Sequence, residues 1–221
     1  MSLDITISRD LAGRLRLGVL VLTGVSVREA NDALADAIAR TCADFKARYG
    51  DGKSGDVPGA ADARTLYKAL GLDPTKTRPS NEALLRRALK GEGLYRINTL
   101  VDALNLCSLS HQLPFGLYDL GKVQPPVVLR RGAPGESYEG IRKGSVNVEE
   151  RPTLADAQGA FGNPTSDSAR TMITLVTSRA LVAAYAPAGY STGRLSDVLE
   201  KTEETLVRFC GGSREDRQIL T

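Results

Sequence analysis

Apolar residues follow two different spacings in the first quarter of the chain. Residues 15–23, LRLGVLVLT, run apolar or alternate, which predicts a strand that is covered on one or both faces. Over 27–49 the apolar positions recur at helical spacing, behind Ser26 and Glu29 at the spacing of a capping box. We therefore predict a strand, then a helix, then a loop over 50–60, where Gly, Asp and Pro gather.

Helical spacing returns three times in the middle of the chain. A short helix is predicted over 63–70, and a second, amphipathic one lies in 78–91, with Ser80 as a natural N-cap and Gly91 as a stop. The run 97–114 reads as a third helix with one apolar face. The middle of the chain is thus mainly helical.

The third of these helices carries an unusual polar stripe. Asn98, Asp102 and Asn105 stand at positions i, i+4 and i+7, so they share one side of the helix. Solvation of an outward face is the ordinary explanation. Asn and Asp are poor helix formers, however, and need a local reason to be present beside so apolar a face.

After Pro125 the pattern becomes that of short strands. Three segments, 127–131, 136–144 and 146–150, are punctuated by glycine and proline, and 172–186 suggests a buried hairpin. A closing helix is predicted over 191–209, ended by a glycine pair. Strands and helices do not alternate strictly, which favours an α+β fold over a doubly wound sheet.

Composition restricts the class of protein. The chain has 221 residues, 42% of them hydrophobic and 25% charged, which fits one globular domain over 1–221 and argues against a disordered or fibrous chain. The apolar runs are too short to span a bilayer, and the start of the chain lacks a signal-peptide core. We expect a soluble, cytoplasmic protein that does not bind a membrane.

Cysteine and histidine usage points away from metal and disulfide chemistry. Cys42, Cys107 and Cys210 are far apart and odd in number, and His111 is the one histidine of the chain. The sequence also lacks the phosphate-loop, dinucleotide, zincin and nucleophile-elbow motifs. We expect no cofactor and no metal. We interpret His111 as a surface or capping residue in preference to a general base.

A net charge of +3 and a pI near 8.8 permit nucleic-acid binding without requiring it. The pairs Arg86-Arg87 and Arg130-Arg131 could touch phosphate groups, although solvated surface is the more ordinary interpretation of such pairs.

The densest set of hydrogen-bonding groups lies in the stretch 159–171, GAFGNPTSDSART. Gly162 lets the backbone approach a ligand, and its polar side chains could hold an amino group together with a carboxyl group or a ribose. Alternatively, the same groups only tie down a turn in which Arg170 pairs with Asp167. The polar residues concerned are Asn163, Thr165, Ser166, Asp167, Ser168 and Arg170.

Several of these segments together resemble the tRNA-editing module, the B-three/B-four domain, of the phenylalanyl-tRNA synthetase beta subunit, and still more closely its stand-alone relatives. The resemblance covers most of residues 60–185. It is carried by Pro79-Ser80, Ile97-Asn98, Val101-Asp102, Asn105, Leu113-Pro114, Tyr118-Asp119-Leu120 and the run from Gly159 to Ser168.

The resemblance implies a fold and a function. The fold is a mixed sheet sandwich with helices on one side, with a core at about 60–185, a strand and helix added before it and a helix added after it. The implied function is that of an RNA-binding protein that binds tRNA or aminoacyl-tRNA and hydrolyses a wrongly attached amino acid in trans. An amino acid or its derivative is a further possible ligand.

Two positions depart from the synthetase pattern. Gly116 stands where the synthetase module has a histidine, and Pro164 stands about where it often has a glutamate. The catalytic residues are therefore unknown, and an esterase lacking both groups would be slow, with water positioned by Asn, Ser or Asp side chains. Two alternatives stay open: a non-catalytic RNA or protein interaction module, and a binder of a small amino acid derivative.

We predict that the polar stripe of the helix and the polar loop line one shared pocket, since the resemblance brings both to the same sheet face. The ligand-binding candidates are Asn98, Asp102, Asn105, Asp119, Asn163, Thr165, Ser166, Asp167, Ser168 and Arg170.

Overall fold

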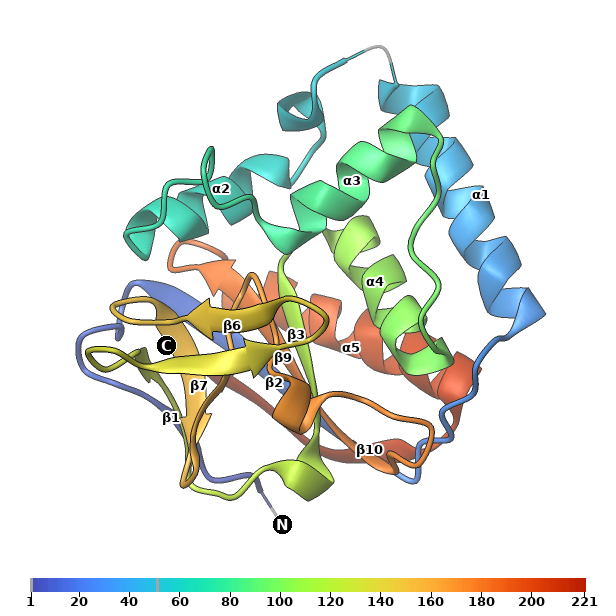
Figure 1. Cartoon of the computed structure of the whole chain (residues 1–221). Helices are drawn as coiled ribbons and strands as arrows, with labels where there is room; N and C mark the ends of the chain where they lie inside the picture. The colour runs from blue at the N-terminus through green and yellow to red at the C-terminus, as the bar shows by residue number, and fades with distance from the viewer. Residues whose placement is uncertain (1, 51) are drawn as a thin grey trace.

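The computed structural model describes residues 2–50 and 52–221, and it contains two four-stranded sheets packed face to face (Figure 1). The sheet in the middle of the molecule, here the central sheet, has the strand order β10-β2-β9-β3, and all its neighbours are antiparallel. Its strands are β2 (Leu15–Thr23), β3 (Phe115–Asp119), β9 (Arg179–Pro187) and β10 (Ser213–Leu220).

The outer sheet has the order β1-β4-β7-β8, in which only the pair β1 and β4 is parallel. A separate hairpin of β5 and β6 lies beside it. These strands are β1 (Ile5–Ile7), β4 (Val127–Arg131), β5 (Ser137–Gly140), β6 (Gly144–Asn147), β7 (Pro152–Asp156) and β8 (Gly159–Gly162).

Helices cover the central sheet on the side away from the outer sheet. In Figure 1, α1, α3 and α4 lie together at the upper right, whereas β1, β6 and β7 lie at the lower left. This helical layer consists of α1 (Asp32–Tyr49), α3 (Ser80–Lys90), α4 (Thr99–His111) and α5 (Thr192–Cys210). Helix α2 (Ala60–Ala69) instead reaches the core between the sheets, and short 3-10 turns are η1 (Ser54–Asp56), η2 (Leu120–Lys122) and η3 (Ala169–Thr171).

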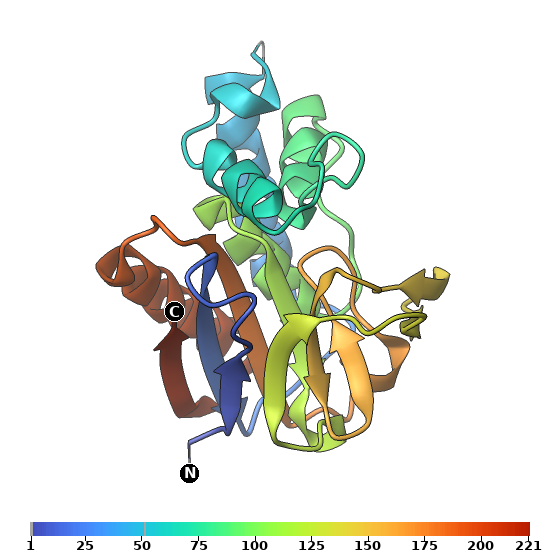
Figure 2. The same ribbon diagram turned by 90° about the vertical axis from the view of Figure 1, so that its left-hand side faces the viewer.

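Both faces of the central sheet are buried, which explains the nearly continuous apolar runs of its strands. Along β9, Leu181 and Tyr185 point into the core between the sheets, whereas Val182 and Ala184 point toward the helices. The side view in Figure 2 shows the central sheet between the two layers. A hydrophobic core therefore lies on each face of the central sheet, and the face on which a side chain of the sheet lies decides which of these two cores it can reach.

The predicted α+β sandwich with helices on one side is confirmed. The strand over 15–23 and the strand over 127–131 have the predicted bounds, and α2, α3, α4 and α5 all lie where helices were expected. Gly91 ends α3 in the left-handed conformation, as a C-cap glycine does. The prediction of Ser80 as N-cap was one residue late, because Pro79 holds that position.

The predicted start of the first helix was wrong. Helix α1 begins at Asp32, behind Asn31, whose side chain accepts a hydrogen bond from the Leu34 amide at 3.0 Å. The segment with capping-box spacing, 26–29, does not start the helix, because tertiary contacts hold its backbone elsewhere. The amide of Ser26 donates to the Cys210 carbonyl at 2.7 Å, and that of Arg28 donates to the Thr99 hydroxyl at 3.0 Å.

The hairpin predicted over 172–186 was also wrong, because β9 is a single strand that begins at Arg179. The turn lies earlier in the chain: the Thr174 amide donates to the Thr177 hydroxyl, which in turn donates to Asp119 at 2.8 Å. Strand β10 was not predicted at all. Its sequence, SREDRQIL, is polar because it forms the edge of the central sheet.

Two further expectations concern the whole chain. Among the described residues, no helix is both long and apolar enough to cross a membrane. The three cysteines, Cys42, Cys107 and Cys210, are free and buried, and burial raises the pKa of each thiol, to about 11 for Cys107.

Candidate functional site

Two side chains of the polar stripe of α4, Asn98 and Asp102, form hydrogen bonds with backbone amides at the start of their own helix. Asn98 is the N-cap, and its side-chain oxygen accepts a hydrogen bond from the Val101 amide at 3.0 Å. Asp102 accepts one from the Ile97 amide at 2.9 Å and lies 3.6 Å from the Arg96 guanidinium. Both side chains are buried, and burial raises the pKa of Asp102 against the effect of these partners. The stripe therefore positions the helix.

The rest of α4 offers no second reason to place a site there. Asn105 is half-buried, and His111 ends the helix beside Lys201 of α5. Burial and the positive charge of Lys201 lower the pKa of His111 to about 4, so its imidazole is neutral at pH 7.

The predicted shared pocket was wrong. Helix α4 packs on the helical face of the central sheet, and its apolar residues belong to that core. Asp167 lies near Tyr118, whose ring belongs to the core between the sheets. The central sheet separates the polar stripe from the polar loop, because successive residues of a strand point to opposite faces.

Asp119 is a structural tie at the end of β3. One carboxylate oxygen accepts a hydrogen bond from the Gly121 amide at 3.1 Å, and the other accepts one from the Thr177 hydroxyl at 2.8 Å. Lys122 lies 3.6 Å away. The carboxylate is thus occupied by the 3-10 turn that follows it and by the loop before β9.

The loop 163–170 is held largely by its own side chains. The side-chain oxygen of Asn163 accepts from the amides of Thr165 and Ser166, both at 2.8 Å, and its nitrogen donates to the Tyr138 hydroxyl at 3.0 Å. The Ser168 hydroxyl accepts from the Arg170 amide at 3.1 Å. Asn163 and Ser168 therefore shape the loop, which leaves fewer groups for a ligand.

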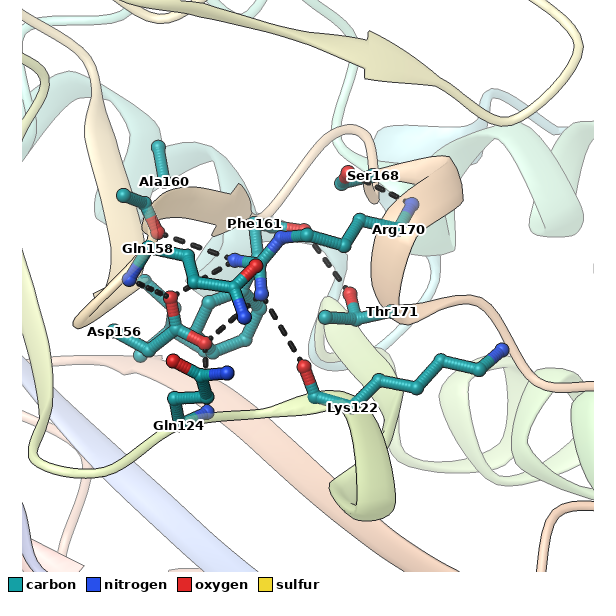
Figure 3. A network of polar contacts seen from close by, with 12 residues as sticks. Lys122, Gln124, Asp156, Gln158, Ala160, Phe161, Ser168, Arg170 and Thr171 are labelled. Atoms are coloured by element: carbon teal, nitrogen blue, oxygen red, sulfur yellow. Dashed lines mark hydrogen bonds and ion pairs between the residues drawn. The ribbon is translucent and has the colours of Figure 1, made fainter.

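Arg170 does not pair with Asp167, so that part of the alternative was wrong, although Asn163 and Ser168 do tie down the turn. Figure 3 shows its guanidinium turned toward Asp156, with which it forms two hydrogen bonds of 3.0 and 2.9 Å. It also donates to the backbone carbonyls of Lys122 and Gly159. Asp156 is fully buried at its side chain, and these contacts hold its pKa below the usual range despite burial.

Asp167 is left without the partner that its sequence neighbours suggested. The residue is half-buried, yet its Oδ1 is shielded from solvent and has no hydrogen-bond partner within residues 2–50 and 52–221. Burial raises the pKa of this carboxyl to about 7, although the nearby Tyr118 hydroxyl and Leu117 amide act to lower it. At neutral pH it therefore exchanges between its two protonation states.

Four tyrosine hydroxyls surround this part of the loop. The Tyr67 hydroxyl donates to the Pro164 carbonyl at 2.9 Å, and that of Tyr138 donates to the Ser166 carbonyl at 2.6 Å. The hydroxyls of Tyr118 and Tyr185 lie 3.4 Å apart. Burial raises the pKa of all four, so they stay protonated. We call Tyr67, Tyr118, Tyr138 and Tyr185 the tyrosine cage.

Two glycines make room for the cage. A Cβ atom on Gly116 would overlap the Tyr118 hydroxyl, and one on Gly162 would overlap the Tyr118 ring. Gly116 is one of the two positions that depart from the synthetase pattern that this sequence resembles. In this chain a side chain at Gly116 would displace Tyr118.

Sequence reasoning missed Tyr67, Tyr138 and Tyr185 as site residues. A signal was present: the chain has seven tyrosines and no tryptophan, and Tyr185 interrupts a run of small apolar residues, AAYA, in a buried strand. A buried tyrosine needs a partner for its hydroxyl, so such a position suggests a polar site inside the core.

Chemically, the cage and the loop bring a carboxyl of neutral-range pKa together with hydroxyl donors and acceptors. The described residues contain no group of three or more His, Cys, Asp or Glu side chains placed to hold a metal ion. A carboxyl whose pKa lies near 7 can gain or lose a proton at neutral pH, and the hydroxyls beside it can donate or accept hydrogen bonds.

Comparison with known proteins identifies the family and the fold of the chain. A model of the B3/4 domain family matches residues 62–219, a range that includes most of α2, the loop 163–170, α5 and nearly all of β10. The chain belongs to the B3/4 domain family. No curated protein matches it.

A solved structure has the same fold as this B3/4 protein. It is an N-terminal fragment of the phenylalanyl-tRNA synthetase beta subunit from Pyrococcus horikoshii, with a TM-score of 0.53 and 12% sequence identity. The match covers 100% of this chain and 55% of the fragment, so the chain spans about half of the fragment's length.

Proposed function

We propose that this B3/4 protein binds the aminoacylated 3′ end of a tRNA and hydrolyses the ester that joins the amino acid to it, acting in trans. Membership of the family and the fold shared with a tRNA-synthetase fragment support tRNA as the partner. Such a substrate implies a cytoplasmic protein. The proposed site is the tyrosine cage with the loop 163–170.

The observation that carries the proposal is the unpartnered Oδ1 of Asp167 inside the cage. A shielded carboxylate oxygen without a hydrogen bond costs folding free energy, which makes this oxygen a candidate contact for a ligand. The other carboxyls proposed from sequence, Asp102 and Asp119, are consumed by backbone and hydroxyl donors. A bound water or ammonium group would supply the donor that Asp167 lacks.

The proposed reaction uses Asp167 as general base. Its carboxylate takes a proton from water as the water oxygen attacks the ester carbonyl, and the proton then passes to the departing ribose oxygen. The products are the free amino acid and a tRNA with its terminal hydroxyl restored. A base whose pKa is about 7 suits this role at neutral pH, and a placed base contributes roughly 10²–10⁴-fold to a rate.

Two half-buried hydroxyl side chains extend the site toward solvent. Thr165 lies 3.0 Å from the Tyr67 hydroxyl, and Ser166 lies 3.2 Å from the Lys143 ammonium group. Both can exchange these contacts for hydrogen bonds to a ribose or to an amino acid. They mark the side of the cage at which substrate would enter.

The test is deacylation of a panel of misacylated tRNAs. Wild-type protein should release the amino acid from at least one of them, and Asp167→Asn should lower that rate by about a hundredfold while leaving binding of uncharged tRNA unchanged. The matched control is Asp36→Asn, at an exposed position of α1, which should act as wild type.

Three results would count against the proposal. A rate that is equal in Asp167→Asn and wild type removes Asp167 from catalysis. Binding of aminoacyl-tRNA without hydrolysis on the whole panel favours the non-catalytic RNA module. Binding of free amino acids but not of tRNA favours the small-molecule binder.

A further inference from the structure

A second candidate site lies in the helical layer. Residues 50 and 52–56 face Arg64 of α2 and one side of α3 across a cleft of about 650 Å³. Figures 1 and 2 both show η1 and the adjoining end of α3 at the end of the helical layer that is farthest from the sheets. The cleft is therefore separate from the tyrosine cage.

The acidic groups of the cleft are occupied within the protein. Both carboxylate oxygens of Glu82 accept from the Arg64 guanidinium, at 2.9 and 2.7 Å, and Glu82 is buried. Asp56 accepts from the Lys53 amide at 2.9 Å. Glu82 is thus neutralised by Arg64, whereas the exposed Asp56 keeps its negative charge and offsets part of the charge of the remaining cations.

Three exposed cations remain: Lys53, Arg86 and Lys90. Among the described residues, Lys90 is the one of the three with a side-chain ion pair, to Glu92 at 3.8 Å, whereas Lys53 has the Asp56 carboxylate bonded to its backbone amide. Arg86 and Lys90 are one helical turn apart, so they lie side by side along α3. The cleft thus presents an excess of positive charge on a concave, glycine-lined surface.

The other arginines of the two sequence pairs show how unusual Arg86 is. Arg130 makes two hydrogen bonds to Glu136, and Arg131 lies 3.4 Å from Asp10. Arg87 lies 3.1 Å from Glu92 and stacks on the Tyr95 ring, 4.1 Å from its centroid. Within the described chain, Arg86 is the member of these pairs without an ionic partner, and it faces the cleft.

We propose that this cleft binds the sugar-phosphate backbone of RNA, with Lys53, Arg86 and Lys90 as the phosphate contacts. The inference rests on the proposed function, because it assigns the surface that would hold the tRNA whose end reaches the cage. Helix α2 joins the two places: Arg64 lines the cleft, and Tyr67, one turn further along, belongs to the cage. An RNA strand entering the cage would pass this cleft.

The experiment measures binding of uncharged tRNA at several salt concentrations, which requires no catalysis. Each phosphate contact adds about 0.7 to 0.9 to the slope of log affinity against log salt, because neutralised phosphates release counterions. Arg86→Gln combined with Lys90→Gln should weaken binding roughly tenfold and lower that slope by about 1.5. The matched control, Arg9→Gln with Arg14→Gln, removes two exposed charges elsewhere and should leave the slope unchanged.

Equal losses in the cleft variant and in the control would overturn the proposal, since net charge alone would then explain binding. An unchanged affinity in the cleft variant would also overturn it. Displacement of tRNA by inorganic phosphate at low millimolar concentration would assign the cleft to a small anion instead. If the proposed hydrolysis fails but the cleft proposal holds, the results differ from these. Asp167→Asn then deacylates as wild type does, while the cleft variant still loses RNA binding.

Discussion

The polar stripe of α4 and the polar loop 163–170 both contain Asn and Asp, yet their side chains differ in how fully the surrounding protein satisfies their hydrogen bonds. Asn98 and Asp102 have their side chains bonded to backbone amides at the start of their own helix. In the loop, Asn163 and Ser168 are likewise bonded within the turn, but one shielded oxygen of Asp167 has no hydrogen-bond partner among the residues that the structure describes. The two regions lie on opposite faces of the central sheet.

The difference teaches that polar composition alone does not mark a site. What separates the regions is whether the local backbone satisfies the polar side chains. A buried group whose hydrogen bonds are complete stabilises the fold, whereas a buried group left incomplete carries a free-energy cost that a ligand can offset. On this criterion we propose Asp167 as the functional residue of the loop, whereas Arg170, three residues away, holds the fold through Asp156.

The largest predicted effect on stability separates these two residues of the loop. Arg170→Met leaves the buried carboxylate of Asp156 without its two charged hydrogen bonds, so unfolding free energy should fall by about 3 to 5 kcal/mol. Urea unfolding measures the change, with Arg9→Met as an exposed control. A loss below about 1 kcal/mol would mean that Arg170 is free for a ligand.

The second prediction concerns pH. The carboxyl of Asp167 has a pKa near 3.8 in the unfolded chain and about 7 in the folded one. Between these values the unfolded state releases its proton and the folded state retains it, so stability falls as pH rises from about 4 to 7 and is level above that. The loss is on the order of a few kcal/mol.

Asp167→Asn should remove this dependence. The difference in unfolding free energy between variant and wild type should therefore grow in favour of the variant from pH 4 to pH 7. Other acidic groups act in the opposite direction, since the pKa of Glu136 is lowered to about 2 by Arg130, but they cancel in the difference. A difference that does not vary with pH would place Asp167 in an ordinary environment.

The third prediction tests the space taken by Tyr118. Gly116→Ala places a methyl group against the Tyr118 hydroxyl and should destabilise the fold by about 1 to 3 kcal/mol through overpacking. Combining it with Tyr118→Leu should recover part of the loss. Gly189→Ala, where no atom lies within 4 Å of the added carbon, serves as control in the same thermal melts. Equal melting temperatures for both alanine variants would show that Tyr118 can move to make room for the added methyl group at little cost in stability.

The smallest predicted effect belongs to the helix cap. Asn98→Ala removes the acceptor of the Val101 amide and should cost about 1 kcal/mol, whereas Asn98→Ser should keep most of the stability. Deacylation by the folded fraction should not change in either variant. A loss of activity without a loss of stability would return Asn98 to the site.

How much of the fold could be predicted from the sequence depends on whether each element is held by neighbouring residues or by residues distant in the chain. Local periodicity predicted the strand over 15–23 and α5, because the faces that each element buries determine the spacing of apolar residues along its own sequence. It failed over 26–31, where Thr99 and Cys210 hold the backbone from a distance. It also failed for β10, a polar edge strand whose pairing comes from β2.

The site follows the same rule. The loop was identified from its composition and from the family resemblance, and its turn-forming side chains follow from local chemistry. The partner of Arg170 and the tyrosine cage did not follow, because Asp156 and the four tyrosines come from different elements that meet only in the folded chain.

The most direct test of the central claim is a titration of the Asp167 side chain by carbon NMR in the whole chain, with its carboxyl signal assigned as the one that is lost in Asp167→Asn. The tyrosine cage and the missing partner predict a midpoint of about pH 7. A midpoint near pH 4, the ordinary range for an aspartate, would show a solvated or paired carboxylate and would contradict Asp167 as the working group of the site.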